Sequence, residues 1–179
     1  MHLLESPSPW VTRFATLIPK DGRAIDLACG CGRHARHLAT MGYQVEAVDR
    51  DVAILEPLSA LPGVTTKCAD LEGGPWPYFG EVFDGVIVTR YLYRPLMPQI
   101  LSLLAPGGVL IYETFMTGHE LFGKPSNPAY LLRPGELLDL VKSRLTIVAF
   151  EQGRIDSPAQ AMVQRICAVR GKTGSLPTI

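Results

Sequence analysis

The chain has 179 residues, of which 47% are hydrophobic and 19% are charged. This length is typical of one domain, and the composition excludes an intrinsically disordered chain. Lys and Arg together number 17, as do Asp and Glu, so the net charge is zero. A balanced charge gives no general attraction to nucleic acid or to an anionic membrane. We therefore expect one domain over residues 1–179 that has neither kind of partner.

The start of the chain and its cysteines indicate a cytoplasmic protein with reduced thiols. The first ten residues, MHLLESPSPW, include an early Glu and two prolines, and they lack the basic start and apolar core of a signal peptide. No apolar run approaches the roughly 20 residues that a membrane helix needs. Four cysteines are too few for a disulfide scaffold in a chain of this size.

Short apolar or β-branched runs alternate with helix-like segments along most of the chain. The segment Ser8–Pro19 has Trp10, Phe14 and Leu17 at helical spacing, so residues 1–20 are expected to form a helical cover. The first five expected strands are Arg23–Cys29, Gln44–Asp49, Val64–Asp70, Phe83–Arg90 and Gly108–Phe115. The helices expected between them are Arg33–Met41, Asp51–Leu61 and Pro95–Leu104. This alternation predicts βαβ units and a parallel sheet with helices on both faces.

The alternation ends near the carboxyl terminus. A helix is expected at Glu136–Ser143, and two further strands at Leu145–Glu151 and Ala161–Arg170. Only a short polar link joins these two strands, which predicts a hairpin. The predicted fold class is therefore α/β, a three-layer sandwich around a mostly parallel seven-stranded sheet with the last strand antiparallel.

Acidic residues and a glycine-rich turn stand at the ends of the first three expected strands. Asp26 precedes the turn 28–32 (ACGCG), while Asp49 and Asp70 end the second and third strands. The carboxyl ends of parallel strands meet at one edge of a sheet, where ligands bind. Asp49 is suited to accept hydrogen bonds from two ribose hydroxyls, and Asp70 from an adenine amino group. The charge of Asp26 suits a cationic group on the ligand.

A nicotinamide-binding protein is one alternative interpretation of the same turn. Gly30-x-Gly32-x-x-Ala35, followed by Asp49, fits the dinucleotide fingerprint. However, Asp26 would then bring negative charge close to a pyrophosphate, whereas such loops offer backbone amides and a helix amino terminus. The chain is also too short for a separate substrate domain.

The segment 26–32 (DLACGCG) resembles the first motif of the class I S-adenosylmethionine-dependent methyltransferases, and most of all their small tellurite-resistance-like branch. The resemblance covers Arg23 to Phe115. Asp49 matches the family's ribose-binding acid, Asp70-Leu71 its adenine-side motif, and 104–108 (LAPGG) the turn before the fifth strand. It departs from the family at Ala28, where a glycine is most common.

This resemblance implies a Rossmann-like fold, S-adenosyl-L-methionine as cofactor, and methyl transfer to an acceptor. The cofactor-binding residues that it implies are Asp26, Ala28, Cys29, Gly30, Gly32, His34, Asp49, Arg50, Asp70, Leu71 and Arg90. With no recognition module and no basic bias in the sequence, we expect the acceptor to be a small molecule. A module that binds S-adenosylmethionine or S-adenosylhomocysteine without catalysis is the first alternative, and a nicotinamide-dependent oxidoreductase is the second.

The acceptor side is less well defined by the sequence. The segment 89–94 (TRYLYR) lies where the family places residues around the transferred methyl, and it lacks the Asn-Pro-Pro-Tyr type of motif found in amino-methylating members. Its tyrosines and arginines suit an anionic or planar acceptor, or simply cap the sheet. Residues 116–133 form a long connection and are a candidate substrate loop. The acceptor-pocket candidates are Tyr91, Tyr93, Arg94, Glu113, Tyr130 and Arg133.

No catalytic residue and no metal site are assigned from the sequence. Cys29 and Cys31 form a Cys-x-Cys and His34 and His37 lie three apart, but no second pair stands at ligand spacing. The sequence leaves open whether the protein is a monomer or a homodimer.

Overall fold

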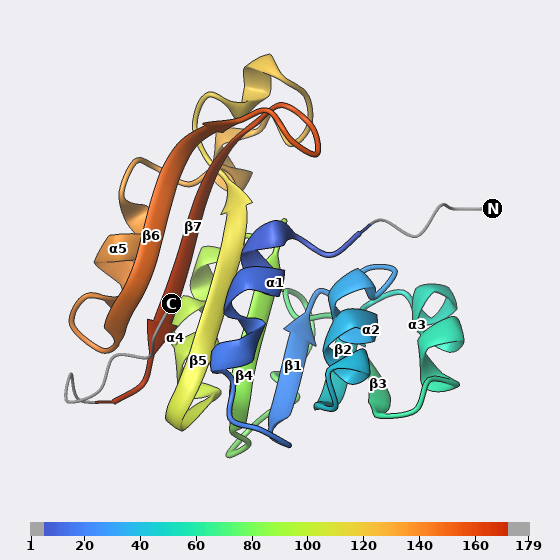
Figure 1. Cartoon of the computed structure of the whole chain (residues 1–179). Coiled ribbons are helices and arrows are strands. Elements are labelled where there is room, and N and C mark those ends of the chain that lie inside the picture. The colour runs from blue at the N-terminus through green and yellow to red at the C-terminus, as the bar shows by residue number, and fades with distance from the viewer. Residues whose placement is uncertain (1–5, 172–179) are drawn as a thin grey trace.

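The computed structural model describes residues 6–171, and within them seven strands form one sheet. The strands are β1 (Arg23–Leu27), β2 (Gln44–Asp49), β3 (Val64–Cys68), β4 (Phe83–Thr89), β5 (Leu104–Phe115), β6 (Thr146–Ile155) and β7 (Ala161–Val169). Their order is β3-β2-β1-β4-β5-β7-β6, and β7 runs antiparallel to both of its neighbours while the other pairs are parallel (Figure 1). The predicted seven-stranded, mostly parallel sheet with a reversed last strand is confirmed.

Helices cover both faces of this sheet. They are α1 (Pro9–Phe14), α2 (Arg33–Thr40), α3 (Val52–Ser59), α4 (Met97–Ser102) and α5 (Glu136–Val141), with short 3-10 turns η1 (Ala15–Leu17), η2 (Arg94–Leu96), η3 (His119–Leu121) and η4 (Pro128–Tyr130). Side chains of α1, α2 and α3 pack on one face, and those of α4 and α5 on the other. Since the helices after β1 and β4 lie on opposite faces, the chain diverges between these strands, which is where open α/β sheets bind ligands.

The amino-terminal segment forms the expected cover, although residues 1–5 of the predicted segment lie outside the described residues. Trp10 and Phe14 of α1 are buried against the sheet, with their rings 4.6 Å apart and edge to face. Ser8 begins the helix, because its Oγ accepts a hydrogen bond from the Trp10 N–H at 3.1 Å. Leu17 is only partly buried.

Most predicted boundaries lie within two residues of the observed ones, but β5 begins four residues earlier and β6 ends four residues later than predicted. The helix expected at Pro95–Leu104 is shorter, and β5 already begins at Leu104, before the Pro-Gly-Gly turn. Phe83 pairs with Leu104 but Gly85 pairs with Val109, so the turn is accommodated as a bulge within β5. At the other edge, β6 continues to Ile155 because its pairing with β7 extends to the hairpin.

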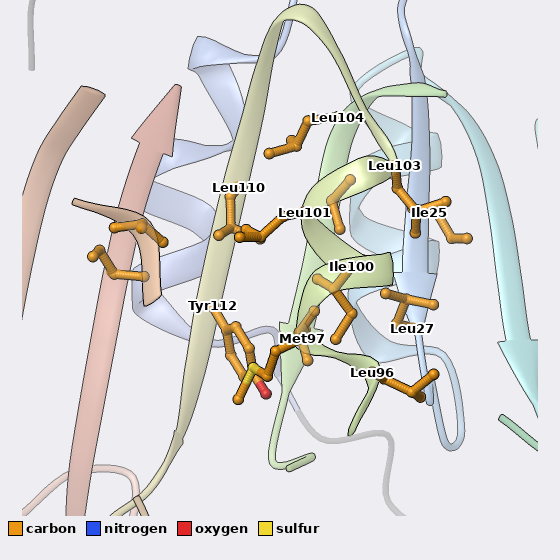
Figure 2. Close-up of a cluster of buried hydrophobic side chains, with 14 of the residues drawn as sticks. Ile25, Leu27, Leu96, Met97, Ile100, Leu101, Leu103, Leu104, Leu110 and Tyr112 are labelled. Carbon is orange, nitrogen blue, oxygen red and sulfur yellow. The ribbon is translucent and has the colours of Figure 1, made fainter. Parts of the chain in front are cut away.

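The core on the α4 face holds β1, β4 and β5 in register. Figure 2 shows Leu96, Met97, Ile100 and Leu101 packed against side chains from the strands, among them Ile25, Leu27, Leu110 and Tyr112. Burial of one such side chain contributes about 1.5–3 kcal/mol. This packing fixes where the strands end, and so the positions of the loops that follow them.

Candidate functional site

A hollow of about 470 Å³ lies beyond the carboxyl ends of β1, β2 and β3. It is lined by Ala28, Asp49, Arg50, Asp51, Ile54, Ala69, Asp70, Leu71, Glu72, Tyr91 and Tyr130. Its volume lies in the usual range for small-molecule sites. Five predicted cofactor residues therefore meet in one place: Ala28, Asp49, Arg50, Asp70 and Leu71.

The glycine-rich turn after β1 depends on left-handed backbone conformations. Ala28, Gly30 and Gly32 have φ values of 52°, 53° and 72°. A Cβ at Gly32 would lie 2.4 Å from Leu58 Cδ1, so only glycine fits there, whereas a Cβ at Gly30 would meet no atom within 4 Å. Ala28 adopts a conformation that costs an L-residue about 1 kcal/mol, whereas glycine would adopt it without this cost.

Asp49 connects this turn to the end of β2. Its Oδ2 accepts a hydrogen bond from the Gly30 N–H at 2.9 Å, and its Oδ1 accepts one from the Asp51 N–H at 3.2 Å. A carboxylate has about four acceptor positions, so Asp49 retains capacity for hydroxyl donors in the hollow.

Asp70 is arranged similarly at the end of β3. Its Oδ1 accepts from the backbone N–H groups of Gly73 at 3.1 Å and Glu72 at 3.0 Å, and these bonds lower the pKa of its carboxyl group. It is therefore an ionised acceptor at the edge of the hollow.

Asp26 lies beneath the turn and is only 1% exposed. Its Oδ2 accepts from the Ala35 N–H in α2 at 3.0 Å, but its Oδ1 is buried and has no hydrogen-bond partner within residues 6–171. Burial raises the pKa of Asp26 to about 7. A buried carboxylate oxygen of this kind is costly unless a donor or cation approaches it.

His34 is not on the lining of the hollow but anchors the amino-terminal segment. It is 1% exposed, and its Nε2 accepts from the Ser8 N–H at 3.1 Å. The proton must then lie on Nδ1, which is 3.3 Å from Thr89 Oγ1. Burial lowers the pKa of His34 to about 3, so the ring is neutral at physiological pH.

Glu113, at the end of β5, is also held by other residues. Its Oε1 accepts from the Ser8 hydroxyl at 2.7 Å, and its Oε2 lies 3.2 Å from an Arg165 guanidinium nitrogen. Arg165 in turn bonds Glu151 at 2.7 Å and lies over the Trp10 ring.

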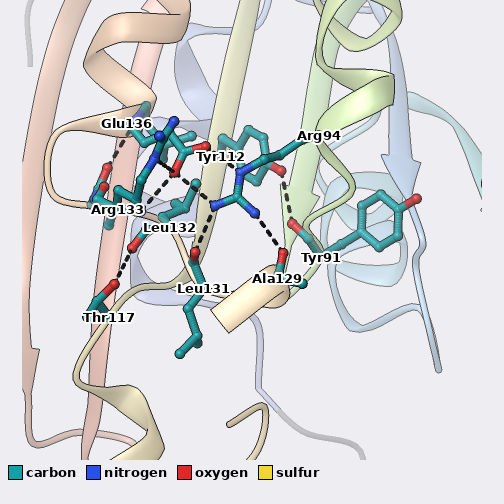
Figure 3. A network of polar contacts seen from close by, with 11 residues as sticks. Tyr91, Arg94, Tyr112, Thr117, Ala129, Leu131, Leu132, Arg133 and Glu136 are labelled. Carbon is teal, nitrogen blue, oxygen red and sulfur yellow. Dashed lines mark hydrogen bonds and ion pairs between the residues drawn. The ribbon is translucent and has the colours of Figure 1, made fainter. Parts of the chain in front are cut away.

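The other acceptor-pocket candidates divide into two groups. Tyr91 and Tyr130 line the hollow next to the acids. Tyr93 does not line it and packs against the core, as Tyr91 also does. Arg94 is bonded to Glu136 and to two backbone carbonyls (Figure 3), and Arg133 makes an exposed contact of 3.4 Å with Glu136.

Besides Asp26 and His34, four predicted cofactor residues are not on the lining of the hollow: Cys29, Gly30 and Gly32 of the turn, and Arg90. Arg90 has φ 52° and donates its N–H to the Glu113 carbonyl at 2.9 Å. Four further residues that line the hollow were not predicted from the sequence: Asp51, Ile54, Ala69 and Glu72. Each lies within five residues of Asp49 or Asp70, and this proximity was the available signal.

Within residues 6–171, no group of three or more His, Cys, Asp and Glu side chains could hold a metal ion. No helix in the same part of the chain is both long and apolar enough to cross a membrane.

Comparisons with known proteins agree with this geometry. Residues 11–92 match the family model of the tellurite resistance protein TehB. No curated protein sequence matches the chain. The structure is similar to that of TehB from Haemophilus influenzae, with a TM-score of 0.75 and 17% identity over 93% of this chain. This chain spans 63% of that protein's length.

Two further solved structures share this fold over most of their own length. A SAM-dependent methyltransferase from Methanosarcina mazei gives a TM-score of 0.71 at 16% identity, covering 93% of this chain and 99% of the other. The 1,6-didemethyltoxoflavin-N1-methyltransferase from Burkholderia thailandensis gives 0.69 at 19% identity, covering 92% and 77%. The chain thus has the fold of a class I S-adenosylmethionine-dependent methyltransferase, and over residues 11–92 its sequence matches the TehB-like branch of that family.

Proposed function

We propose that the protein is an S-adenosylmethionine-dependent methyltransferase that acts on a small-molecule acceptor. The fold supports this proposal, as does the finding that similar proteins, the B. thailandensis enzyme and the glycopeptide N-methyltransferase MtfA, were crystallised with S-adenosylhomocysteine. The single-domain organisation, the cytoplasmic location, the lack of a nucleic-acid partner and the monomeric or homodimeric state stay predictions.

The observation that carries the proposal is the unpartnered oxygen of Asp26 beneath the glycine-rich turn. An ammonium group of the ligand, held at the turn above this buried carboxylate, would stabilise its ionised form by charge attraction. Asp49 keeps acceptor positions for ribose hydroxyls, and Asp70 can accept from an adenine amino group. The residues present therefore fit the three polar parts of this cofactor.

Bound in this hollow, the cofactor would supply a methyl group already activated on a sulfonium. The protein then has mainly to align the acceptor and exclude water, and alignment alone contributes several kcal/mol. A general base is needed only if the acceptor arrives protonated. Glu113 is the acidic side chain at the end of β5, but it is bonded to Ser8 and Arg165, so an acceptor would have to displace the Ser8 hydroxyl to reach it.

Thermal unfolding with added ligands tests the cofactor assignment. S-adenosylmethionine and S-adenosylhomocysteine at 100 times their dissociation constants should each stabilise the protein by about 2.7 kcal/mol, whereas NAD should leave the melting temperature unchanged. Stabilisation by NAD alone would instead establish the oxidoreductase alternative.

A cofactor-binding module without catalysis is the second candidate, because the charged groups Arg94, Glu113 and Glu136 are all bonded to other residues of the chain. The protein incubated with S-adenosylmethionine and a metabolite extract separates the two functions. An enzyme releases S-adenosylhomocysteine in proportion to time, whereas a binding module releases none above the level of the extract alone.

A further inference from the structure

One residue of the hollow comes from a distant part of the chain. Tyr130 belongs to η4, in the long connection between β5 and α5, yet it lines the same hollow as Asp49, Asp70 and Tyr91. Its side chain is 48% exposed, so burial alone does not fix its position. The next residue, Leu131, is buried and Asn127 caps η4, and a further interaction fixes this backbone from the segment after β4.

Arg94 supplies that interaction. One of its Nη atoms donates to the Ala129 carbonyl at 2.7 Å and the other to the Leu131 carbonyl at 2.8 Å. These are the two residues on either side of Tyr130. Figure 3 shows the guanidinium bonded to both of these carbonyls. Arg94 therefore holds the backbone on both sides of the tyrosine.

Glu136, at the start of α5, fixes the guanidinium itself. The Arg94 Nε lies 2.6 Å from Glu136 Oε1, and the second Nη lies 2.9 Å from Oε2. Glu136 Oε2 also accepts from the Arg133 N–H at 2.8 Å. Burial acts to raise the pKa of Glu136, but the bonds from Arg94 and Arg133 outweigh it and lower the pKa, so the carboxylate is ionised at neutral pH.

This arrangement requires the planar guanidinium group of an arginine. The guanidinium bonds a carboxylate through two parallel N–H groups and still has donors for both carbonyls. A lysine at this position would keep the charge but offer a single nitrogen, which cannot reach all four acceptors.

We propose that Arg94 is a positioning residue that holds Tyr130 as a wall of the cofactor pocket, and not a residue that binds the acceptor. This inference rests on the proposed function. Arg94 acts on the bound nucleoside only through Tyr130, and together they set the affinity and the residence time of the cofactor and of its demethylated product.

Binding of S-adenosylhomocysteine tests the inference in full-length variants, by calorimetry for the dissociation constant and by chase of labelled ligand for the dissociation rate. Tyr130→Ala changes a half-exposed side chain and leaves the core intact, so we expect a folded protein with about tenfold weaker binding and faster release. Arg94→Lys should weaken binding about fivefold. Since Arg94 acts through Tyr130, the double variant should bind as Tyr130→Ala does.

Arg154→Lys is the matched control. Arg154 also bonds a carboxylate, Asp156 at 3.0 Å, and lies over the Phe122 ring of the same connection, but it does not line the hollow. The dissociation constant of this variant for S-adenosylhomocysteine should stay within twofold of the wild-type value.

Two results would overturn the inference while leaving the proposed function in place. One is a Tyr130→Ala variant that binds S-adenosylhomocysteine with wild-type affinity. The other is a double variant whose fold-loss of affinity equals the product of the fold-losses of the two single variants. If the wild-type protein itself does not bind S-adenosylhomocysteine, the proposed function fails and the inference fails with it.

Discussion

The two sides of the candidate site are built in different ways. On the side proposed to bind the nucleoside, backbone N–H groups donate to Asp49 and Asp70, and both carboxylates still face the hollow. On the side formed by β4 and β5, Ser8 bonds Glu113, and Arg94 bonds Glu136. The first side is organised to receive a ligand, whereas the second holds together segments that lie far apart in the chain.

Two buried groups, Asp26 beneath the turn and His34 at the start of α2, should give opposite pH dependences of stability. Asp26 has a folded-state pKa of about 7 against an ordinary 3.8, so the folded protein retains a proton that the unfolded chain loses, and stability falls by about 4 kcal/mol as the pH rises between these values. His34 has a folded-state pKa of about 3 against 6.5. The unfolded chain then holds the extra proton, and stability rises with pH by a similar amount.

In the wild type, the contributions of Asp26 and His34 to the pH dependence of the free energy of unfolding cancel over pH 4–6.5. Urea unfolding at pH 4.5, 5.5 and 6.5 should therefore show Asp26→Asn gaining stability relative to the wild type as the pH rises. His34→Gln should lose stability relative to the wild type over the same range. If either variant differs from the wild type by a constant amount at every pH, that group does not titrate as described.

Asp49→Ala tests the nucleoside side alone. Removal of the carboxylate leaves ribose hydroxyls without acceptors and frees the Gly30 N–H, so affinity for S-adenosylhomocysteine should fall by about 1–3 kcal/mol in calorimetry. Asp49→Asn keeps one acceptor oxygen and should lose less. Equal affinity of Asp49→Ala and the wild type would remove Asp49 from the binding site.

The same contrast explains what the sequence could predict. Asp49 ends β2, and Asp70 lies two residues beyond the end of β3. One helix precedes each of these strands, so the βα repeat places both acids at the same edge of the sheet. By contrast, Ser8 and Glu113 lie 105 residues apart, and Arg94 and Glu136 lie 42 apart. No local pattern encodes such pairs, since they depend on where the amino-terminal segment and the long connection pack. For this reason the sequence predicted Arg94 and Glu113 as residues of the pocket that binds the methyl acceptor.

Ser8→Ala tests the second side. The change removes the cap of α1 and the hydrogen bond to Glu113, and it leaves the backbone bond to His34. We expect a loss of about 1–2 kcal/mol in the free energy of unfolding, measured in urea. Ser8→Thr retains a hydroxyl and serves as the control. If the alanine variant is as stable as the threonine variant, this hydroxyl does not hold the segment in place.

Ala28→Gly should have the smallest effect, because it changes the nucleoside side without removing a polar group. Glycine relieves about 1 kcal/mol of strain at φ 52°, but it also adds roughly 0.5 kcal/mol of backbone entropy to the unfolded chain. The net gain in stability should be about 0.5 kcal/mol, with the affinity for S-adenosylhomocysteine unchanged. Gly32→Ala makes the opposite change in the same turn and would place a Cβ 2.4 Å from Leu58, so it must destabilise the protein. If Ala28→Gly lowers stability as well, the left-handed conformation of Ala28 carries no strain.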